Sequence, residues 1–332
     1  MKLKTGNCGT RLALLASGMM LLAGANWAHW AHAQDFPNRL VRLITGGSQG
    51  GPVDIASRVV AQRLAELWSQ AVIVENRVGA SEILAGEAVS KAKPDGYTLL
   101  IAGNVITHNP ALFAKLQYDP ERGFAPITLM MQSPMALVIA ANTPHQTLSD
   151  LIAAAKQRSG QLAWASAGIG TNNHLAGEQF ALLAGIKAIH TPYKGSQPAA
   201  AAVLGGEVAY GIVALTSALA NAKAGTLRLL ALTSEKRSPL APGVPSLAEQ
   251  GVSGVDGAVR AGLVGPVGLP QAIIARVNAD VNRILAEPQI RERFATLGME
   301  PLGTTPEEYD AYNKRMITQV RAIVAQAGIK VE

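Results

Sequence analysis

Two glycine-rich turns contain the residues of this sequence that are best suited to bind a small ligand. The first, residues 45–54 (TGGSQGGPVD), follows an apolar run at residues 40–44 and opens a helical pattern. Amide N–H groups at the start of a helix have no partner within that helix, so they can converge on an anion. This turn therefore predicts a docking place for a carboxylate.

The second turn, residues 166–174 (SAGIGTNNH), also lies after a predicted strand and before a predicted helix. Its small residues let the backbone approach a ligand closely, and Thr171 or Asn172 can cap the helix while its amides face outward. A plain helix-capping loop has the same composition, and that alternative stays open. Two such turns, one in each predicted lobe, favour an anion held between them.

Residues 46–50 also spell G-x-S-x-G, the nucleophile elbow of serine hydrolases, with Ser48 as the nucleophile. An elbow serine needs an oxyanion-hole loop from an earlier strand, and too few residues of the predicted mature chain precede Ser48 to form one. A short match is also easily obtained in a chain with 33 glycines. A secreted serine hydrolase therefore stays the alternative function. The P-loop lysine is absent because Pro52 follows Gly51.

The histidines predict no metal centre. His174 follows the second turn and could bind a ligand, but packing or capping is an equally ordinary role for it. His108, His145 and His190 form no H-E-x-x-H or similar cluster. We expect neither a metal nor another cofactor. Tyr193 and Lys194 offer a phenol and an ammonium at another predicted strand end, for which a solvated turn is the alternative reading.

The first 33 residues have the pattern of a secretory signal peptide. Lys2, Lys4 and Arg11 precede an apolar stretch at residues 12–25, and residues 31–33 (AHA) predict cleavage before Gln34. An uncleaved membrane anchor is the alternative, although the apolar stretch is shorter than the roughly 18 to 20 residues that a spanning helix needs. The chain is therefore predicted to be exported.

Composition limits the partners of the mature chain. Cys8, the only cysteine, lies within the predicted signal, so cysteine nucleophiles, zinc thiolates and disulfides are excluded. Removal of the three positive charges of the signal lowers the formal net charge from +6 to +3. Lysine and arginine are dispersed, so no nucleic-acid partner is expected. A mature chain of about 300 residues is longer than a single hydrophobic core usually accommodates, so we predict two domains.

Strand-like runs alternate with helical patterns, which predicts an α/β fold with largely parallel sheets. Strands are expected at residues 39–44, 71–75, 98–102, 135–140, 161–165, 188–190, 209–213 and 227–233, and helices at 53–68, 83–91, 147–158, 172–184 and 198–204. The C-terminal third is predicted to be helical at 271–286, 289–297 and 306–327, with no strand between these helices. Thr305 to Glu308 is a capping box with proline at the first helical position.

Two apolar segments, residues 126–133 and 259–264, are placed to cross between two lobes. Residues 34–128 and 263–332 are then predicted to form the first lobe and residues 129–262 the second. The C-terminal helices are expected to pack back onto the first lobe.

These segments together resemble the tripartite tricarboxylate transporter substrate-binding family, also called the Bug family of periplasmic solute receptors. The likeness covers nearly the whole mature sequence and rests on GGPVD (50–54), VENRVGA (74–80), PDGYTLL (94–100), YDP (118–120), FAPI (124–127), GIGTNNH (168–174), HTPYKG (190–195), GGEV (205–208) and PSLAEQG (245–251). Each motif alone is weak, whereas all of them in family order are very specific.

The resemblance implies a two-lobed, type II-like periplasmic binding fold that closes on a small organic carboxylate and delivers it to membrane permease subunits. It implies a monomer, no catalytic residue and no cofactor. The ligand-binding residues it points to are Ser48, Gln49, Gly50, Gly51, Asp54, Ala80, Ser81, Ser166, Gly170, Thr171, His174, Tyr193 and Gly195. A periplasmic sensory subunit that presents its solute to a membrane kinase needs the same closed form and stays a further alternative.

Several residues depart from the family pattern near the expected site. Ser81, Glu82 and Ile83 stand where the family usually has Gly-Gly-Asn, and Val213 replaces a common aspartate, which makes an amino acid ligand less favoured. Arg260 replaces the aromatic residue usual in the late crossing strand. It is predicted either to pair with a second carboxylate on the ligand or to be solvated and exposed.

Overall fold

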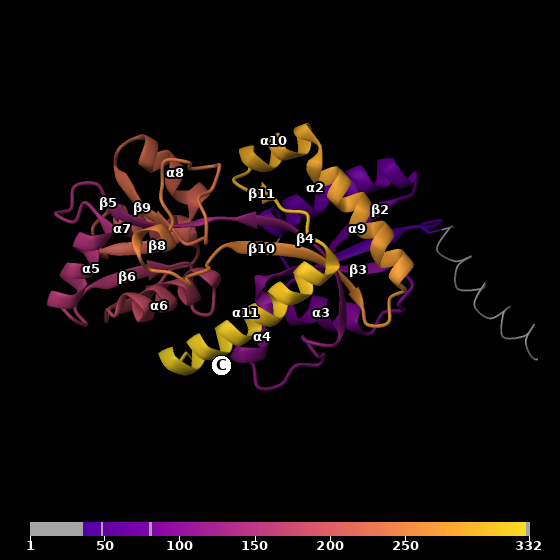
Figure 1. Cartoon of the computed structure of the whole chain (residues 1–332), viewed down its shortest axis with the longest axis horizontal. Helices are drawn as coiled ribbons and strands as arrows, with labels where there is room; N and C mark the ends of the chain where they lie inside the picture. The colour runs from indigo at the N-terminus through magenta and orange to yellow at the C-terminus, as the bar shows by residue number, and fades with distance from the viewer. Residues whose placement is uncertain (1–35, 48, 80–81, 330–332) are drawn as a thin grey trace, which may run out of the picture.

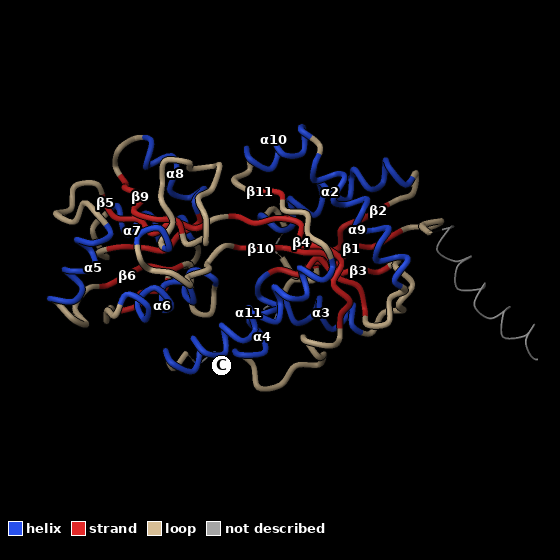
Figure 2. Tube along the Cα trace, viewed as in Figure 1, coloured by secondary structure: helices blue, strands red, loops and turns tan. Residues whose placement is uncertain are grey.

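The computed structural model describes residues 36–47, 49–79 and 82–329 and contains two β-sheets, each covered by helices (Figures 1 and 2). The α/β class and the two-lobed architecture predicted from the sequence are confirmed. The predicted signal peptide lies outside the described residues, as do Ser48, Ala80 and Ser81.

The first lobe is built on a six-stranded sheet with the order β11-β4-β10-β3-β1-β2. Its strands are β1 (Val41–Thr45), β2 (Val72–Asn76), β3 (Thr98–Gly103), β4 (Phe124–Ser133), β10 (Val259–Pro266) and β11 (Glu300–Pro301). Strand β1 pairs in parallel with β2 and β3, while β10 runs antiparallel to both β3 and β4. The three parallel strands therefore end at one edge of this sheet.

The second lobe is built on a five-stranded sheet with the order β7-β6-β8-β5-β9. Its strands are β5 (Met135–Ala140), β6 (Ala163–Ser166), β7 (Ile189–Pro192), β8 (Tyr210–Ala214) and β9 (Leu227–Leu232). Strand β6 is parallel to β7 and β8, but β5 is antiparallel to β8 and β9. The prediction of largely parallel sheets is wrong, because strands buried on both faces read as the same continuous apolar runs in either direction.

Helices cover both faces of the first sheet. Helices α2 (Pro52–Trp68), α9 (Gln271–Ala286) and α10 (Pro288–Thr296) share one core with alternate strand residues such as Leu99 and Ile101. Helices α3 (Ile83–Ser90) and α11 (Pro306–Ala327) share the opposite core with Leu100 and Ala102, and α11 packs on α4 (Asn104–Leu112). Successive side chains of a strand point to opposite faces, so this alternation fixes which helices each face carries.

The second sheet is covered in the same way. Residues Met135 and Leu137 of β5 join a core with α5 (Leu148–Gln157) and α6 (Asn172–Ala184). Ala136 and Val138 join the other core with α7 (Ser196–Leu204) and α8 (Leu215–Lys223). A 3-10 helix, η2 (Ala248–Gln250), precedes the return to the first lobe.

Three elements differ from the sequence-based expectation. Helices α4 and α8 were not predicted, since α4 contains Pro110 and α8 follows its strand without an intervening turn. The C-terminal region was predicted to lack strands, yet β11 pairs with β4 at the sheet edge. A two-residue strand has no periodicity that a sequence can show.

The capping box at the start of α11 is confirmed. Thr305 Oγ1 accepts a hydrogen bond from Glu308 N at 3.2 Å, and Glu308 Oε2 accepts one from Thr305 N at 2.8 Å. As expected, α11 packs on the first lobe, but it also contacts α6, where Leu175 shares a core with Val320 and Ile323. Figure 1 shows α11 extending along the molecule from the first lobe toward α6. This helix therefore touches both lobes.

Strands β4 and β10 lie side by side between the lobes (Figure 1). Their pairing continues from Phe124 with Pro266 to Ser133 with Val259, and β5 of the second sheet begins at Met135. The exact lobe limits at residues 129 and 262 stay a prediction.

Among the described residues, no helix combines the length and the apolar composition that crossing a membrane requires.

Gly177→Ala tests how closely α6 packs on the second sheet. A Cβ at this position would lie 2.0 Å from Cη2 of buried Trp164. We expect the free energy of unfolding to fall by about 1–3 kcal/mol, the usual cost of overpacking a core. Gly243→Ala, where a Cβ meets nothing within 4 Å, is the control. Equal stability of the two variants in chemical denaturation would contradict this packing.

Candidate functional site

The two glycine turns follow the carboxyl ends of parallel strands. The three parallel strands of the first sheet end at the same edge: β1 at Thr45, β2 at Asn76 and β3 at Gly103. Ser166 of β6 and Pro192 of β7 are paired at the corresponding edge of the second sheet. Ligands of open α/β sheets bind outside the carboxyl ends of the strands. The topology therefore places both turns where such a fold binds ligands.

A buried carboxylate organises the first turn. Asp54, only 2% exposed, accepts hydrogen bonds from Gly50 N at 2.9 Å, from Arg58 Nε at 3.0 Å and from Asn76 Nδ2 at 2.8 Å. Asn76 also donates to Gly47 O at 3.0 Å. The turn after β1 is thus tied to the end of β2 through Asp54 and Asn76.

Asp54 is an anion whose oxygens are already engaged. Burial acts to raise its pKa, but the hydrogen bonds from Arg58, Gly50 and Asn76 outweigh it and hold the pKa below its ordinary value. Asp54 therefore stabilises the conformation of the turn through internal hydrogen bonds. The Gly50 N–H, which the sequence suggested as a ligand donor, donates to Asp54 in this structure. Gln49 is exposed, and Gly51 caps α2 through its carbonyl, which accepts from Ile55 N.

Asp54→Ala tests this organising role. The change leaves the Gly50 and Asn76 donors without their acceptor, so we expect the protein to lose about 1–3 kcal/mol of stability near neutral pH. Because the folded-state pKa is lowered, the carboxylate stabilises the protein above its unfolded pKa of about 3.9 and loses this effect as the pH falls through the folded pKa. Urea denaturation across this pH range measures the difference.

Asp310→Ala is the matched control, since Asp310 forms an ion pair with Lys314 one turn away on the exposed face of α11. It should change stability little at any pH. A loss in Asp54→Ala that is no larger than in Asp310→Ala, or that persists at acid pH, would contradict the assignment.

In the second lobe, the predicted residues form one hydrogen-bonded cluster. The Ser166 hydroxyl, fully buried, lies 2.7 Å from His190 Nε2 and accepts from Gly168 N at 3.1 Å. Thr171 caps α6, since Oγ1 accepts from His174 N and donates to Gly168 O at 2.7 Å. Gly170 has a φ of +73°, a left-handed conformation that favours glycine.

His174 is confirmed in the packing and capping role that the sequence left open. It is 6% exposed, its ring stacks on His190 at 3.9 Å, and Nδ1 accepts from Gly170 N at 3.1 Å. Its Nε2 lies 3.7 Å from Glu178 Oε1. Burial and the neighbouring His174 lower the pKa of His190 to about 4, so His190 is neutral at physiological pH.

The third predicted segment joins the same cluster. Tyr193 N donates to Ser166 O at 3.0 Å, and Gly195 N donates to Ala167 O at 3.1 Å. The Tyr193 hydroxyl donates to Glu207 Oε2 at 3.0 Å, while Lys194 is exposed. The structure therefore brings together the predicted second-lobe residues other than Arg260, namely Ser166, Gly170, Thr171, His174, Tyr193 and Gly195.

The prediction of a solvated, exposed Arg260 is wrong. It is 9% exposed, and Nη1 donates to both oxygens of Asp256 at 2.7 and 2.8 Å. Nη1 also donates to Tyr312 Oη at 3.2 Å, and Nε donates to Gln132 Oε1 at 3.2 Å. Its charge is matched by Asp256, which the sequence could not show because the intervening residues are not helical.

Two residues at the first edge were missed as site residues. Asn76, noted only within a family motif, bridges Asp54 and Gly47. Glu82, noted only as a departure from the family, reaches Gly103 N with Oε2 at 3.3 Å. Glu82 lies in the connection after β2, whereas Gly103 is the last residue of the parallel strand β3, and only the fold brings them together.

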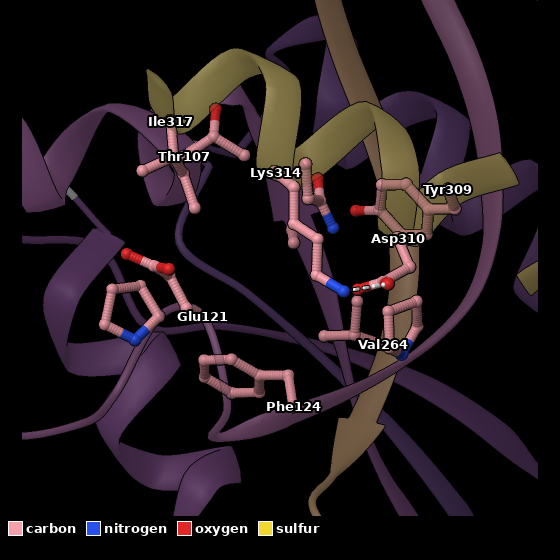
Figure 3. Close-up of a pocket in the computed structure, with 12 residues that line it drawn as sticks. Thr107, Glu121, Phe124, Val264, Tyr309, Asp310, Lys314 and Ile317 are labelled. Carbon is pink, nitrogen blue, oxygen red and sulfur yellow. Dashed lines mark hydrogen bonds and ion pairs between the residues drawn. The ribbon is translucent and has the colours of Figure 1, made fainter. Parts of the chain in front are cut away.

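A separate cavity of about 20 Å³ lies beneath α11 in the first lobe (Figure 3). Phe124, Val264 and Tyr309 contribute to its lining, beside the Lys314–Asp310 ion pair. None of the predicted ligand residues lines it, and its volume suits a water molecule rather than an organic acid. In the part of the chain that the structure describes, no group of three or more His, Cys, Asp or Glu residues is placed to hold a metal.

Two α/β lobes joined by neighbouring crossing strands, with a glycine turn at the carboxyl edge of each sheet, define a two-lobed periplasmic solute-binding protein. The chain belongs to the family described as the tripartite tricarboxylate transporter family receptor, which matches residues 56–329. This membership confirms the resemblance noted in the sequence.

Related sequences and solved structures match most of the length of this chain. Protein BugT of Bordetella pertussis (strain Tohama I) is 31% identical over 321 residues, which cover 96% of this chain and 98% of BugT. The structure of R. palustris Rpa4515 with adipate has a TM-score of 0.74 and 31% identity, and the match covers 89% of this chain and 99% of that one. MatC from Rhodopseudomonas palustris with bound malate has a TM-score of 0.70 and 28% identity, with 87% and 100% covered.

Proposed function

We propose that this protein is a periplasmic receptor that captures a small organic carboxylate and delivers it to the membrane permease subunits of a tripartite tricarboxylate-type transporter. The observation that carries the proposal is the placement of one glycine turn at the carboxyl edge of each sheet. The relatives solved with adipate and with malate support a carboxylate as the ligand class. The mature receptor is proposed to be a monomer exported with a cleaved signal peptide.

Capture is proposed to occur by closure of the lobes about β4 and β10. A ligand favours closure by the difference between its affinities for the closed and open arrangements. Each amide or helix-terminus contact contributes about 0.3–2 kcal/mol. Several such contacts together with the exclusion of water reach the roughly 8 kcal/mol of a micromolar complex. The proposed binding residues are the sequence-predicted residues of both turns, including Ser48, together with Ala80, Ser81, Tyr193 and Gly195.

This function needs no covalent step. The described part of the chain contains one close serine–histidine pair at a strand end, Ser166 with His190, but that serine is fully buried. Its histidine ring stacks on His174, and no described carboxylate hydrogen-bonds to it. A fluorophosphonate probe should therefore leave the protein unlabelled, and labelling at Ser48 would support the hydrolase alternative instead.

Gly50→Val tests the first turn as a binding element. Gly50 has a φ of +77° and open space around its Cβ position, so valine strains the backbone without a clash. We expect a stability loss of about 1–2 kcal/mol from the left-handed conformation. We also expect at least about a tenfold weaker affinity for adipate or malate in titration calorimetry, the equivalent of losing one or two amide contacts.

Gly225→Val is the matched control, since Gly225 has a φ of +72°, nothing within 4 Å of its Cβ position, and a place between α8 and β9. It should lose the same stability while keeping wild-type affinity. Equal affinities in the two variants would refute the assignment of the first turn, and no binding of either acid to the wild type would contradict the proposed ligand class.

A further inference from the structure

Glu82 places a carboxyl group at the carboxyl edge of the first sheet, beside the first glycine turn. A Cβ on Gly46 would lie 2.4 Å from Glu82 Cβ, and a Cβ on Gly103 would lie 2.8 Å from Glu82 Oε1. Both strand-end residues are glycines, and the Glu82 side chain occupies the space between them. The Glu82 side chain therefore lies at the sheet edge where the ligand carboxylate is proposed to bind.

The backbone of Glu82 is strained. Its φ of +68° is a left-handed conformation that a non-glycine residue rarely adopts. Such conformations are retained at ligand sites when the surrounding structure holds them. Here the glycines at positions 46 and 103 are the residues that leave room for this side chain.

Among the residues that the structure describes, no cation balances the charge of Glu82. Its one hydrogen bond among the described residues comes from Gly103 N, and no described lysine, arginine or histidine nitrogen lies within 4 Å of its oxygens. The facing ionisable groups are Tyr118, before β4, and Tyr309, on α11, whose pKa values are raised by burial and further by Glu82. On α4, buried His108 has a pKa lowered to about 4. All three groups are uncharged near neutral pH.

Burial consequently raises the pKa of Glu82 to about 7, although the Gly103 amide counteracts part of the increase. A second carboxylate at this edge would raise it further, because two neighbouring carboxylates without a cation cannot both stay ionised. A proton shared between them removes the repulsion and creates a hydrogen bond.

We propose that Glu82 belongs to the ligand site and meets the bound carboxylate as the neutral acid, donating its carboxyl O–H to a ligand oxygen. Where Glu82 is ionised in the free protein, capture of the ligand then takes up close to one proton from solvent, and no covalent bond to carbon changes. This inference rests on the proposed function, since it requires an anionic ligand at the first turn.

Glu82→Gln tests the inference, because the amide retains a donor and cannot titrate. Affinity for adipate and malate is measured by calorimetry at pH 6.5 and 8.5, in buffers of different ionisation enthalpy that report proton uptake. The wild type should bind about tenfold more weakly at pH 8.5 and should take up close to one proton there. The variant should bind equally at both pH values, about tenfold more tightly than the wild type at pH 8.5.

Glu87→Gln is the matched control, since Glu87 lies on the same helix α3 and pairs with Lys91. It should retain the pH dependence of the wild type. Wild-type affinity that is unchanged with pH, or a pH dependence that survives in Glu82→Gln, would overturn the inference while leaving a carboxylate receptor in place. Failure of both acids to bind either protein at either pH would instead overturn the proposed ligand class.

Discussion

The first half of the site depends on the hydrogen bonds that the buried carboxylate of Asp54 accepts. It binds the Gly50 amide, Arg58 and Asn76 together, and Asn76 carries the connection to Gly47 at the end of β1. Ser166 and His190 hold the corresponding loop of the second lobe, with Thr171 and His174 around it. In both lobes, buried side chains fix a glycine-rich backbone from within. A ligand can then meet preorganised main-chain groups, which lowers the cost of ordering them on binding.

The segment between the lobes is held by a different kind of interaction. Arg260 of β10 binds Asp256 before the strand, Gln132 of β4 and Tyr312 of α11. One guanidinium thus joins both crossing strands to the C-terminal helix, and α11 in turn packs on α6 of the second lobe. Removal of one member of such a buried pair leaves an uncompensated charge, so the crossing region resists local rearrangement. The proposed closure would therefore displace whole lobes rather than melt these strands.

The sequence predicts the elements better than their directions and contacts. Alternating apolar runs located most strands, and Thr305 with Glu308 located the start of α11, because these signals are local. Strand direction depends on topology, and so the antiparallel direction of β5 and β10 was not predicted, although the sequence located both segments. The glycine turns were recognised from composition. The bonds from Asp54 to Asn76, from Arg260 to Gln132 and Tyr312, and from Glu82 to Gly103 instead join segments that are distant in the sequence. Side chains whose roles depend on non-local pairing are the ones the sequence could not assign.

If the two turns approach each other around a carboxylate, the distance between the lobes must shorten when an acid binds. Cys8 is the only cysteine, and Cys8→Ser removes it. Arg77→Cys and Lys194→Cys then provide one spin-label position near each turn, since both residues are exposed and follow β2 and β7. Double electron–electron resonance then measures the distance between the two labels, without ligand and with whichever of adipate and malate binds in calorimetry. We expect the distribution of distances between the two labels to become shorter and narrower in the bound state. An unchanged distribution under saturating acid would contradict it.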